Sequence, residues 1–187
     1  MADEDPLVLL HALGMSPRVW AAVQPWLGTH RAVVALTTLG HRGGAPAARR
    51  PVRVRDLVDH TERALDERGL MRSGVARRLA LRAVAVHGER LTADQALQAA
   101  EDLVDCRVVD DILATDEEVA PLDPLPYPIT LAWAGADAIT PVEVNGAVAR
   151  ARLPQARFVM LSGVGHVPMI DDPQGVAATI LLASERG

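Results

Sequence analysis

Four short apolar runs, each followed by a segment with helical periodicity, limit what this chain can fold into. The runs cover residues 6–10, 32–36, 129–134 and 157–161, and turn residues border them. Continuous apolar runs of this length are typical of strands that are buried on both faces of a parallel sheet. Strands that alternate with helices along the chain predict an α/β fold with helices on both faces of the sheet.

The middle third of the chain has a different pattern. Residues 71–118 are rich in Ala, Leu, Arg and acidic residues and have helical periodicity, and Thr92 and Gln95 have the spacing of a capping box. A group of prolines at positions 121–128 then ends the helical pattern. We therefore expect one domain over residues 1–187, with one mostly parallel, four-stranded sheet. Its core comprises residues 1–70 and 125–187, and residues 71–124 form a helical, cap-like insert.

Charge and composition exclude several classes of function. The chain has a formal net charge of -5 and 3% aromatic residues, which argue against a nucleic-acid partner. The single cysteine, Cys106, excludes an intramolecular disulfide and a multi-cysteine metal site, and we expect no metal and no cofactor. No apolar run is long enough to span a membrane, and the acidic N-terminus is unlike a signal peptide, so we expect a cytoplasmic protein. All 19 basic residues are arginine, which we interpret as the coding bias of a bacterial genome.

Three polar motifs follow predicted strands, where open α/β sheets place their functional sites. They are His11-Ala12-Leu13-Gly14, the stretch from Gly135 through Asp137 to Pro141, and Gly165-His166 ahead of Asp172-Pro173. In this order, the motifs resemble those of the α/β-hydrolase superfamily, and the resemblance covers most of the chain. It implies a three-layer sandwich with a reduced, mostly parallel sheet. It also implies a hydrolase that acts on an ester or a similar small acyl substrate.

The resemblance assigns the acid and the base of the implied site. Asp137 would accept the ring N–H of His166, and His166 would transfer protons as the catalytic base. We expect the two side chains to lie about 2.6–3.2 Å apart. A lone histidine after a strand is usually a polar loop residue, and a lone aspartate before Thr-Pro is usually a helix cap. We favour the catalytic pair because both residues occur together.

Residues near the N-terminus complete the implied site. The backbone N–H of Leu13 would be one donor of an oxyanion hole. Ala12 stands where the family usually has glycine, which tightens this turn. We expect His11 and His41 at the rim of the pocket, with His11 bracing the turn.

The nucleophile motif of the family is missing from this sequence. In the family it is Gly-x-Ser-x-Gly, on a tight turn between a strand and a helix. Residues 69–78, where it is expected, contain neither the strand nor the motif. Cys106 is interpreted as a small buried residue. We infer that the central strand, the nucleophile turn, the helix after it and the next strand are lost at a join near residues 70–75. The four serines of the chain all lie outside such a motif: Ser16, Ser73, Ser162 and Ser184.

Two functions from different classes follow from this pattern. In the first, the protein is an α/β-hydrolase-type enzyme whose activity on a small-molecule substrate is weak or lost. In the second, it is a non-catalytic binding or scaffold remnant, or a deletion product. Loss of central strands exposes apolar sheet edges, so we also expect homo-oligomers or aggregation.

Overall fold

The computed structural model describes residues 7–37, 40–44, 84–114 and 128–185. The chain folds as two compact units. The first unit comprises residues 1–77 and 91–117, and the second comprises residues 78–90 and 118–187. Helical periodicity over residues 54–65 predicts a helix. This predicted helix and the join near residues 70–75 lie outside the described residues.

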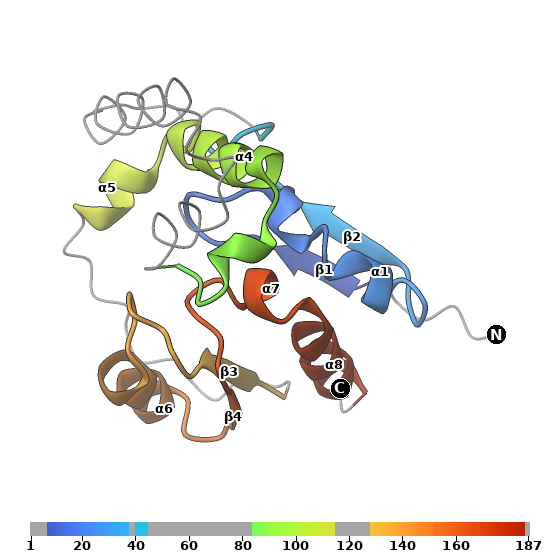
Figure 1. The fold of residues 1–187 in the computed structure, drawn as a ribbon. Helices are drawn as coiled ribbons and strands as arrows, with labels where there is room; N and C mark the ends of the chain where they lie inside the picture. The colour runs from blue at the N-terminus through green and yellow to red at the C-terminus, as the bar shows by residue number, and fades with distance from the viewer. Residues whose placement is uncertain (1–6, 38–39, 45–83, 115–127, 186–187) are drawn as a thin grey trace. The chain divides into compact units, whose positions relative to one another are not determined.

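The first unit begins with two parallel strands joined by a helical crossover (Figure 1). Strand β1 (Leu7–Leu10) pairs with β2 (Val33–Leu36) over the full length of both strands. A short 3-10 helix (Pro17–Trp20) and helix α1 (Gln24–Leu27) lie between them in the chain. The positions of all four elements follow the apolar runs and the turn residues of the sequence.

The crossover is held by a cap at its start and by core side chains at its end. Ser16 is the N-cap of the 3-10 helix, and its hydroxyl accepts the N–H of Arg18 at 3.3 Å. The side chains of Val23 and Leu27 are fully buried. The sequence Ser16-Pro17 predicts this cap, with proline at the first helical position, and the structure confirms it.

Two further helices belong to the first unit. Helix α4 (Ala93–Val104) begins at the predicted capping box, and α5 (Val109–Leu113) follows it. The N–H of Gln95 donates to the hydroxyl of Thr92 at 3.2 Å, and the N–H of Thr92 donates to the Gln95 side chain at 2.8 Å. This reciprocal pair satisfies two backbone donors at the start of α4.

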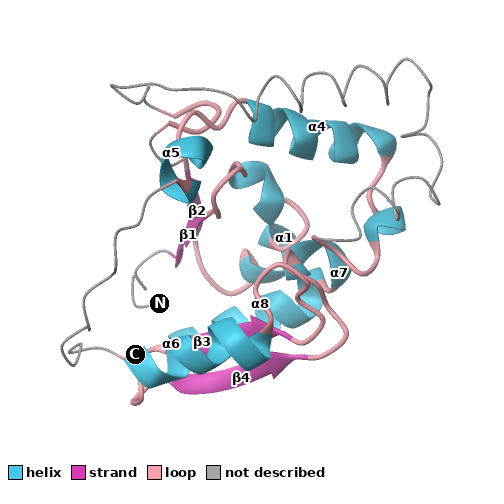
Figure 2. Cartoon of the chain, turned by 90° about the vertical axis from the view of Figure 1, so that its left-hand side faces the viewer, coloured by secondary structure: helices cyan, strands magenta, loops and turns pink. Residues whose placement is uncertain are grey.

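The second unit contains a second parallel pair of strands, drawn side by side in Figure 2. Strand β3 (Thr130–Ala134) pairs with β4 (Arg157–Leu161) over the full length of both strands. A π-helix (Val142–Gly146) continues into α6 (Ala147–Arg152) between them. The carboxyl ends of β3 and β4 therefore lie next to each other, because parallel strands in register end together.

Three helical elements complete the described part of the second unit. Helix α7 (Pro168–Asp171) and helix α8 (Pro173–Ser184) follow β4, and a 3-10 helix (Gly88–Arg90) comes from the earlier segment. The carboxylate of Asp172 accepts the N–H of Gly175 at 2.9 Å and caps α8, as the Asp-Pro sequence predicts. No helix in the described ranges is long and apolar enough to cross a membrane.

The prediction of one four-stranded sheet is wrong for the described residues. They form two separate two-stranded sheets, β1–β2 and β3–β4. Each pair joins strands that are consecutive in the sequence, so a short crossover is enough to bring them together.

The expectation that all strands are buried on both faces is also wrong. The exposed fractions of Val8 and Leu10 in β1 are 55% and 59%, and those of Val34 and Leu36 in β2 are 42% and 45%. These four side chains share one face, because alternate residues of a strand point the same way. Leu9, on the other face, is only 5% exposed. The β1–β2 sheet thus buries one face and leaves the other apolar and exposed.

Candidate active site

Asp137 and His166 are carried by the two loops that leave the carboxyl ends of β3 and β4. Backbone hydrogen bonds join these loops. The N–H of Gly135 donates to the carbonyl of Leu161 at 2.8 Å, and the N–H of Ala136 donates to the carbonyl of Val164 at 2.9 Å. Because these bonds lie next to Asp137 and close to His166, the backbone fixes the distance between the two residues.

The side chains of Asp137 and His166 lie within hydrogen-bonding distance, as predicted. Nδ1 of His166 is 3.0 Å from Oδ2 of Asp137 and 3.1 Å from Oδ1. The side chain of Asp137 is 6% exposed and that of His166 is 31% exposed. The carboxylate is thus shielded from water, whereas part of the imidazole ring stays accessible to a substrate.

Thr140 and Ile139 complete the set of donors to Asp137. The N–H groups of Ile139 and Thr140 donate to Oδ1 at 2.9 and 2.8 Å, and the hydroxyl of Thr140 donates to Oδ2 at 2.7 Å. Burial by itself raises the pKa of Asp137, but hydrogen bonds from Thr140, His166 and Ile139 outweigh it and hold that pKa below its ordinary value. Asp137 is therefore ionised at neutral pH.

An ionised Asp137 determines which nitrogen of His166 carries the proton. A carboxylate only accepts hydrogen bonds, so the neutral ring donates from Nδ1. Nε2 is then the unprotonated nitrogen, with a lone pair that can take a proton. The pair therefore has the chemistry of a general base oriented by an acid.

Thr140 and Glu143 have the spacing that predicts a capping box, and this prediction is wrong. The helix begins after Pro141, and no side chain caps it. The hydroxyl of Thr140 binds Asp137 instead. A hydrogen bond to a shielded, charged carboxylate is stronger than a neutral helix cap. The Thr140 hydroxyl therefore binds Asp137 and does not cap the helix.

The turn that carries Leu13 lies in the first unit. The N–H of Met15 donates to the carbonyl of Ala12 at 3.2 Å, and Gly14 has a φ of 75°. Ala12 does not have a positive φ, so alanine is accommodated at this position without backbone strain. Asp137 and His166 belong to the second unit, and the role of the Leu13 N–H as an oxyanion donor stays a prediction.

His11 and His41 are buried beside this turn. Their exposed fractions are 7% and 8%, and their rings meet edge to face with centroids 4.7 Å apart. A ring nitrogen of His11 lies 3.0 Å from the carbonyl of Ala12, and Nε2 of His41 accepts the N–H of Gly14 at 3.3 Å. Both histidines therefore brace the turn.

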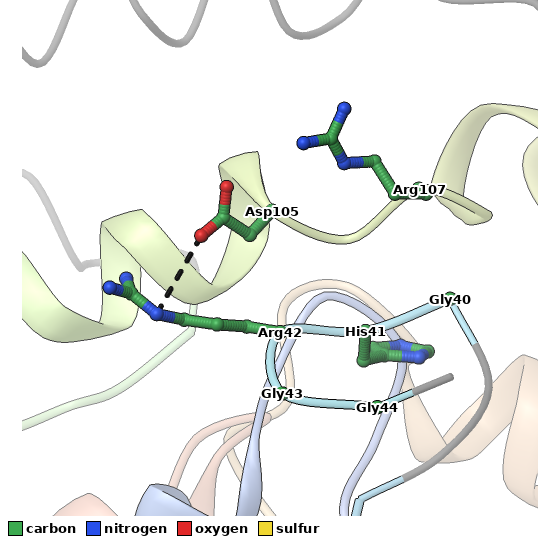
Figure 3. A pocket seen from close by; sticks show the side chains of 7 residues that line it. All are labelled: Gly40, His41, Arg42, Gly43, Gly44, Asp105 and Arg107. Atoms are coloured by element: carbon green, nitrogen blue, oxygen red, sulfur yellow. Dashed lines mark ion pairs between the residues drawn. The ribbon is translucent and has the colours of Figure 1, made fainter. Parts of the chain in front are cut away.

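A shallow pocket of about 260 Å³ lies beside the loop that carries His41 (Figure 3). The guanidinium of Arg42 lies 3.6 Å from the carboxylate of Asp105 and 2.7 Å from that of Glu101. These ion pairs hold the glycine-rich loop against α4. The place of His41 at the rim of a substrate pocket stays a prediction. The pocket is lined by Gly40, His41, Arg42, Gly43, Gly44, Asp105 and Arg107.

Two of the described serines use their hydroxyl groups in hydrogen bonds within the fold. The hydroxyl of Ser16 donates to the buried carboxylate of Asp102, and that of Ser184 donates to the carbonyl of Leu181 at 2.9 Å. Ser162 lies on the surface, and Ser73 lies outside the described residues. Cys106 is buried, as expected. Among the described residues, no group of three His, Cys, Asp or Glu side chains is placed to hold a metal ion.

Known structures share the fold of this chain. A bacterial membrane phospholipase A matches with a TM-score of 0.64 and 16% identity, over 99% of this chain and 80% of its own. Carboxylesterase CesB (YbfK) from Bacillus subtilis matches with a TM-score of 0.60 and 13% identity, over 100% and 86% of the two chains. A meta-cleavage product hydrolase from Pseudomonas fluorescens matches with a TM-score of 0.59 and 13% identity, over 98% and 91%.

No family model and no curated protein matches the sequence. At these identities the similarity is one of fold. The fold is that of the α/β-hydrolases, in a reduced form with short parallel strands in small sheets.

One residue near the pair was not singled out from the sequence. Asp171 is 2% exposed, and its carboxylate accepts the backbone N–H of Gly165, next to His166, at 2.7 Å. The local sequence, two aspartates before a proline, points only to a helix cap. Asp172 is that cap, whereas the carboxylate of Asp171 accepts backbone N–H groups outside the helix.

Proposed function

We propose that this protein is an α/β-hydrolase-type enzyme of low activity, in which Asp137 and His166 perform proton transfer on small ester substrates. The observation that carries the proposal is the 3.0 Å contact between Nδ1 of His166 and Oδ2 of Asp137. The similar structures include a phospholipase A and a carboxylesterase, which makes an ester the substrate class to test first.

In this scheme Nε2 of His166 takes a proton from water as the water oxygen attacks the ester carbonyl. The imidazolium returns the proton to the departing alkoxide, so the products are a carboxylic acid and an alcohol. Asp137 stabilises the imidazolium between the two steps. In this proposal water is the attacking group, because the sequence contains no Gly-x-Ser-x-Gly motif. The enzyme then lacks the rate gain that an activated serine nucleophile would supply.

Hydrolysis of p-nitrophenyl acetate by purified variants tests the proposal. His166→Ala removes the general base and should lower the rate at neutral pH about a hundredfold. Asp137→Asn should lower it as well, because the ring loses its orienting acceptor. His30→Ala is the matched control, since His30 is an exposed imidazole outside the proposed site. The His30→Ala protein should keep the full rate.

The second candidate is a non-catalytic binding or scaffold protein, which the missing nucleophile motif favours. Ser73→Ala tests whether a serine attacks the ester in place of water. Ser73 is chosen because it is the serine within the stretch where the motif is expected. If His166→Ala and Ser73→Ala proteins both hydrolyse the ester as fast as the unmodified chain, the enzyme proposal fails. The binding candidate then stands alone.

A further inference from the structure

Asp171 collects three backbone donors from two separate segments of the second unit. Oδ2 accepts the N–H of Gly165 at 2.7 Å and the N–H of Val86 at 2.9 Å. Oδ1 accepts the N–H of His87 at 2.6 Å. A buried carboxylate is costly unless its oxygens are paired, and here backbone N–H groups on both sides pair them.

The same two segments make further contacts around His166. The N–H of Val167 donates to the carbonyl of Val84 at 2.7 Å. A Cβ on Gly165 would lie 3.0 Å from Cα of Ala85, so a side chain at this position would be crowded against the backbone of Ala85. The guanidinium of Arg90 also donates to the backbone carbonyl of Asp171.

Both neighbours of His166 in the chain are therefore held by residues outside its own loop. Gly165 is bound by the carboxylate of Asp171, and Val167 is bound by the backbone of Val84. His166 lies between these two anchors, so the position of its Cα and the direction of its Cα–Cβ bond are determined by them. Displacement of a catalytic group by about 1 Å is enough to cost about a hundredfold in rate.

We propose that Asp171 is a positioning residue, which holds the loop of His166 so that the ring nitrogen Nδ1 meets Asp137. This inference rests on the proposed function of the Asp137–His166 pair. Asp171 acts through the backbone of Gly165 and the segment at Val86, and it makes no contact with a substrate in this scheme.

The variant Asp171→Asn tests the inference, because it keeps the size of the side chain and removes one acceptor. An amide NH₂ would then face a backbone N–H, and a buried donor without an acceptor destabilises that contact. The matched control is Asp172→Asn, which removes the same charge at the next residue. Asparagine is as good an N-cap as aspartate, so this control should keep α8 and the loop of His166 intact.

The principal measurement is the ring tautomer of His166, from the 15N shifts of the imidazole in NMR spectra. The unmodified protein and Asp172→Asn should show mainly the Nδ1–H form, because Asp137 accepts that proton. Asp171→Asn should shift the ring to mainly the Nε2–H form, which free histidine prefers in water. A tautomer that stays Nδ1–H in Asp171→Asn would overturn the inference, even if the variant unfolds at a lower temperature.

Amide hydrogen exchange of the unmodified protein keeps the inference testable if Asp171→Asn does not fold. The N–H groups of Gly165, Val86 and His87 share one acceptor group, so they should exchange slowly and with similar protection. Exchange of the Gly165 amide at the rate of an unprotected loop would refute the role of Asp171.

Ester hydrolysis separates failure of this inference from failure of the proposed function. Asp171→Asn should lower the rate about a hundredfold, and Asp172→Asn should leave it unchanged. If the unmodified protein shows the Nδ1–H tautomer but no hydrolysis that depends on His166, the proposed function fails and the positioning role of Asp171 stands. If hydrolysis depends on His166 but is unchanged in Asp171→Asn, the positioning role fails alone.

Discussion

Replacement of Thr140 by valine tests the hydrogen bonds that hold Asp137. The Thr140 hydroxyl donates to the carboxylate at 2.7 Å, and the side chain of Asp137 is 6% exposed, so water replaces the lost donor poorly. Valine has nearly the same shape and cannot donate. A hydrogen bond to a charged group contributes about 1.5–3 kcal/mol, and we expect Thr140→Val to lower the free energy of unfolding by about 2 kcal/mol at neutral pH.

The effect of Thr140→Val should depend on pH with a definite sign. The pKa of Asp137 is lowered in the folded protein, so its bonds stabilise the fold above the pKa of the unfolded aspartate, about 3.9. This stabilisation is lost as the pH falls through the lower, folded pKa. The difference between Thr140→Val and the unmodified protein should therefore be full at neutral pH and shrink in acid.

Urea denaturation at neutral and at acidic pH measures both effects. The control is Thr179→Val, because Thr179 is also half-buried and its hydroxyl donates at 2.9 Å to an uncharged acceptor, the carbonyl of Gly175. We expect a loss of about 1 kcal/mol for the control, with no dependence on pH. Equal losses for the two variants, or a loss for Thr140→Val that persists unchanged in acid, would refute the charge-assisted bond.

Three further predictions concern packing and assembly. Gly165→Ala should destabilise the fold by about 1–3 kcal/mol in thermal unfolding, because the new Cβ would meet the backbone of Ala85, and an unchanged melting temperature would contradict the close approach. Ser16→Ala should cost about 1–3 kcal/mol, since it leaves the carboxylate of Asp102, which is 3% exposed, without its hydroxyl donor, and urea denaturation measures the loss. The exposed apolar face of the β1–β2 sheet should make the protein self-associate, and light scattering that shows a single monomer at high concentration would count against this.

Features with a local signal could be predicted from the sequence. The apolar runs placed all four described strands to within a residue, because continuous apolar residues between turn residues have few alternatives. The caps at Thr92 and Asp172 could also be predicted, because a cap depends only on residues next to it in the chain. The approach of Asp137 and His166 followed from their positions after strands that are consecutive in the parallel sheet.

Features that depend on distant segments could not be predicted. Thr140 has two local uses, a helix cap or a donor to Asp137, and only the folded loop decides between them. Asp171 receives donors from residues that are more than 80 positions away in the chain, and no local pattern marks that partnership. The division of the strands into two sheets is likewise a matter of long-range pairing.

The two backbone bonds that join the loops of Asp137 and His166 have a consequence for how such a pair evolves. Both residues, both strands and the bonds between the loops lie within residues 128–185, so the acid and the base are inherited as one contiguous segment. A deletion that spares this segment and the anchoring residues 84–87 can remove a nucleophile and leave the pair with its geometry intact. An aligned aspartate and histidine in a related sequence therefore identifies common descent sooner than it identifies a working enzyme.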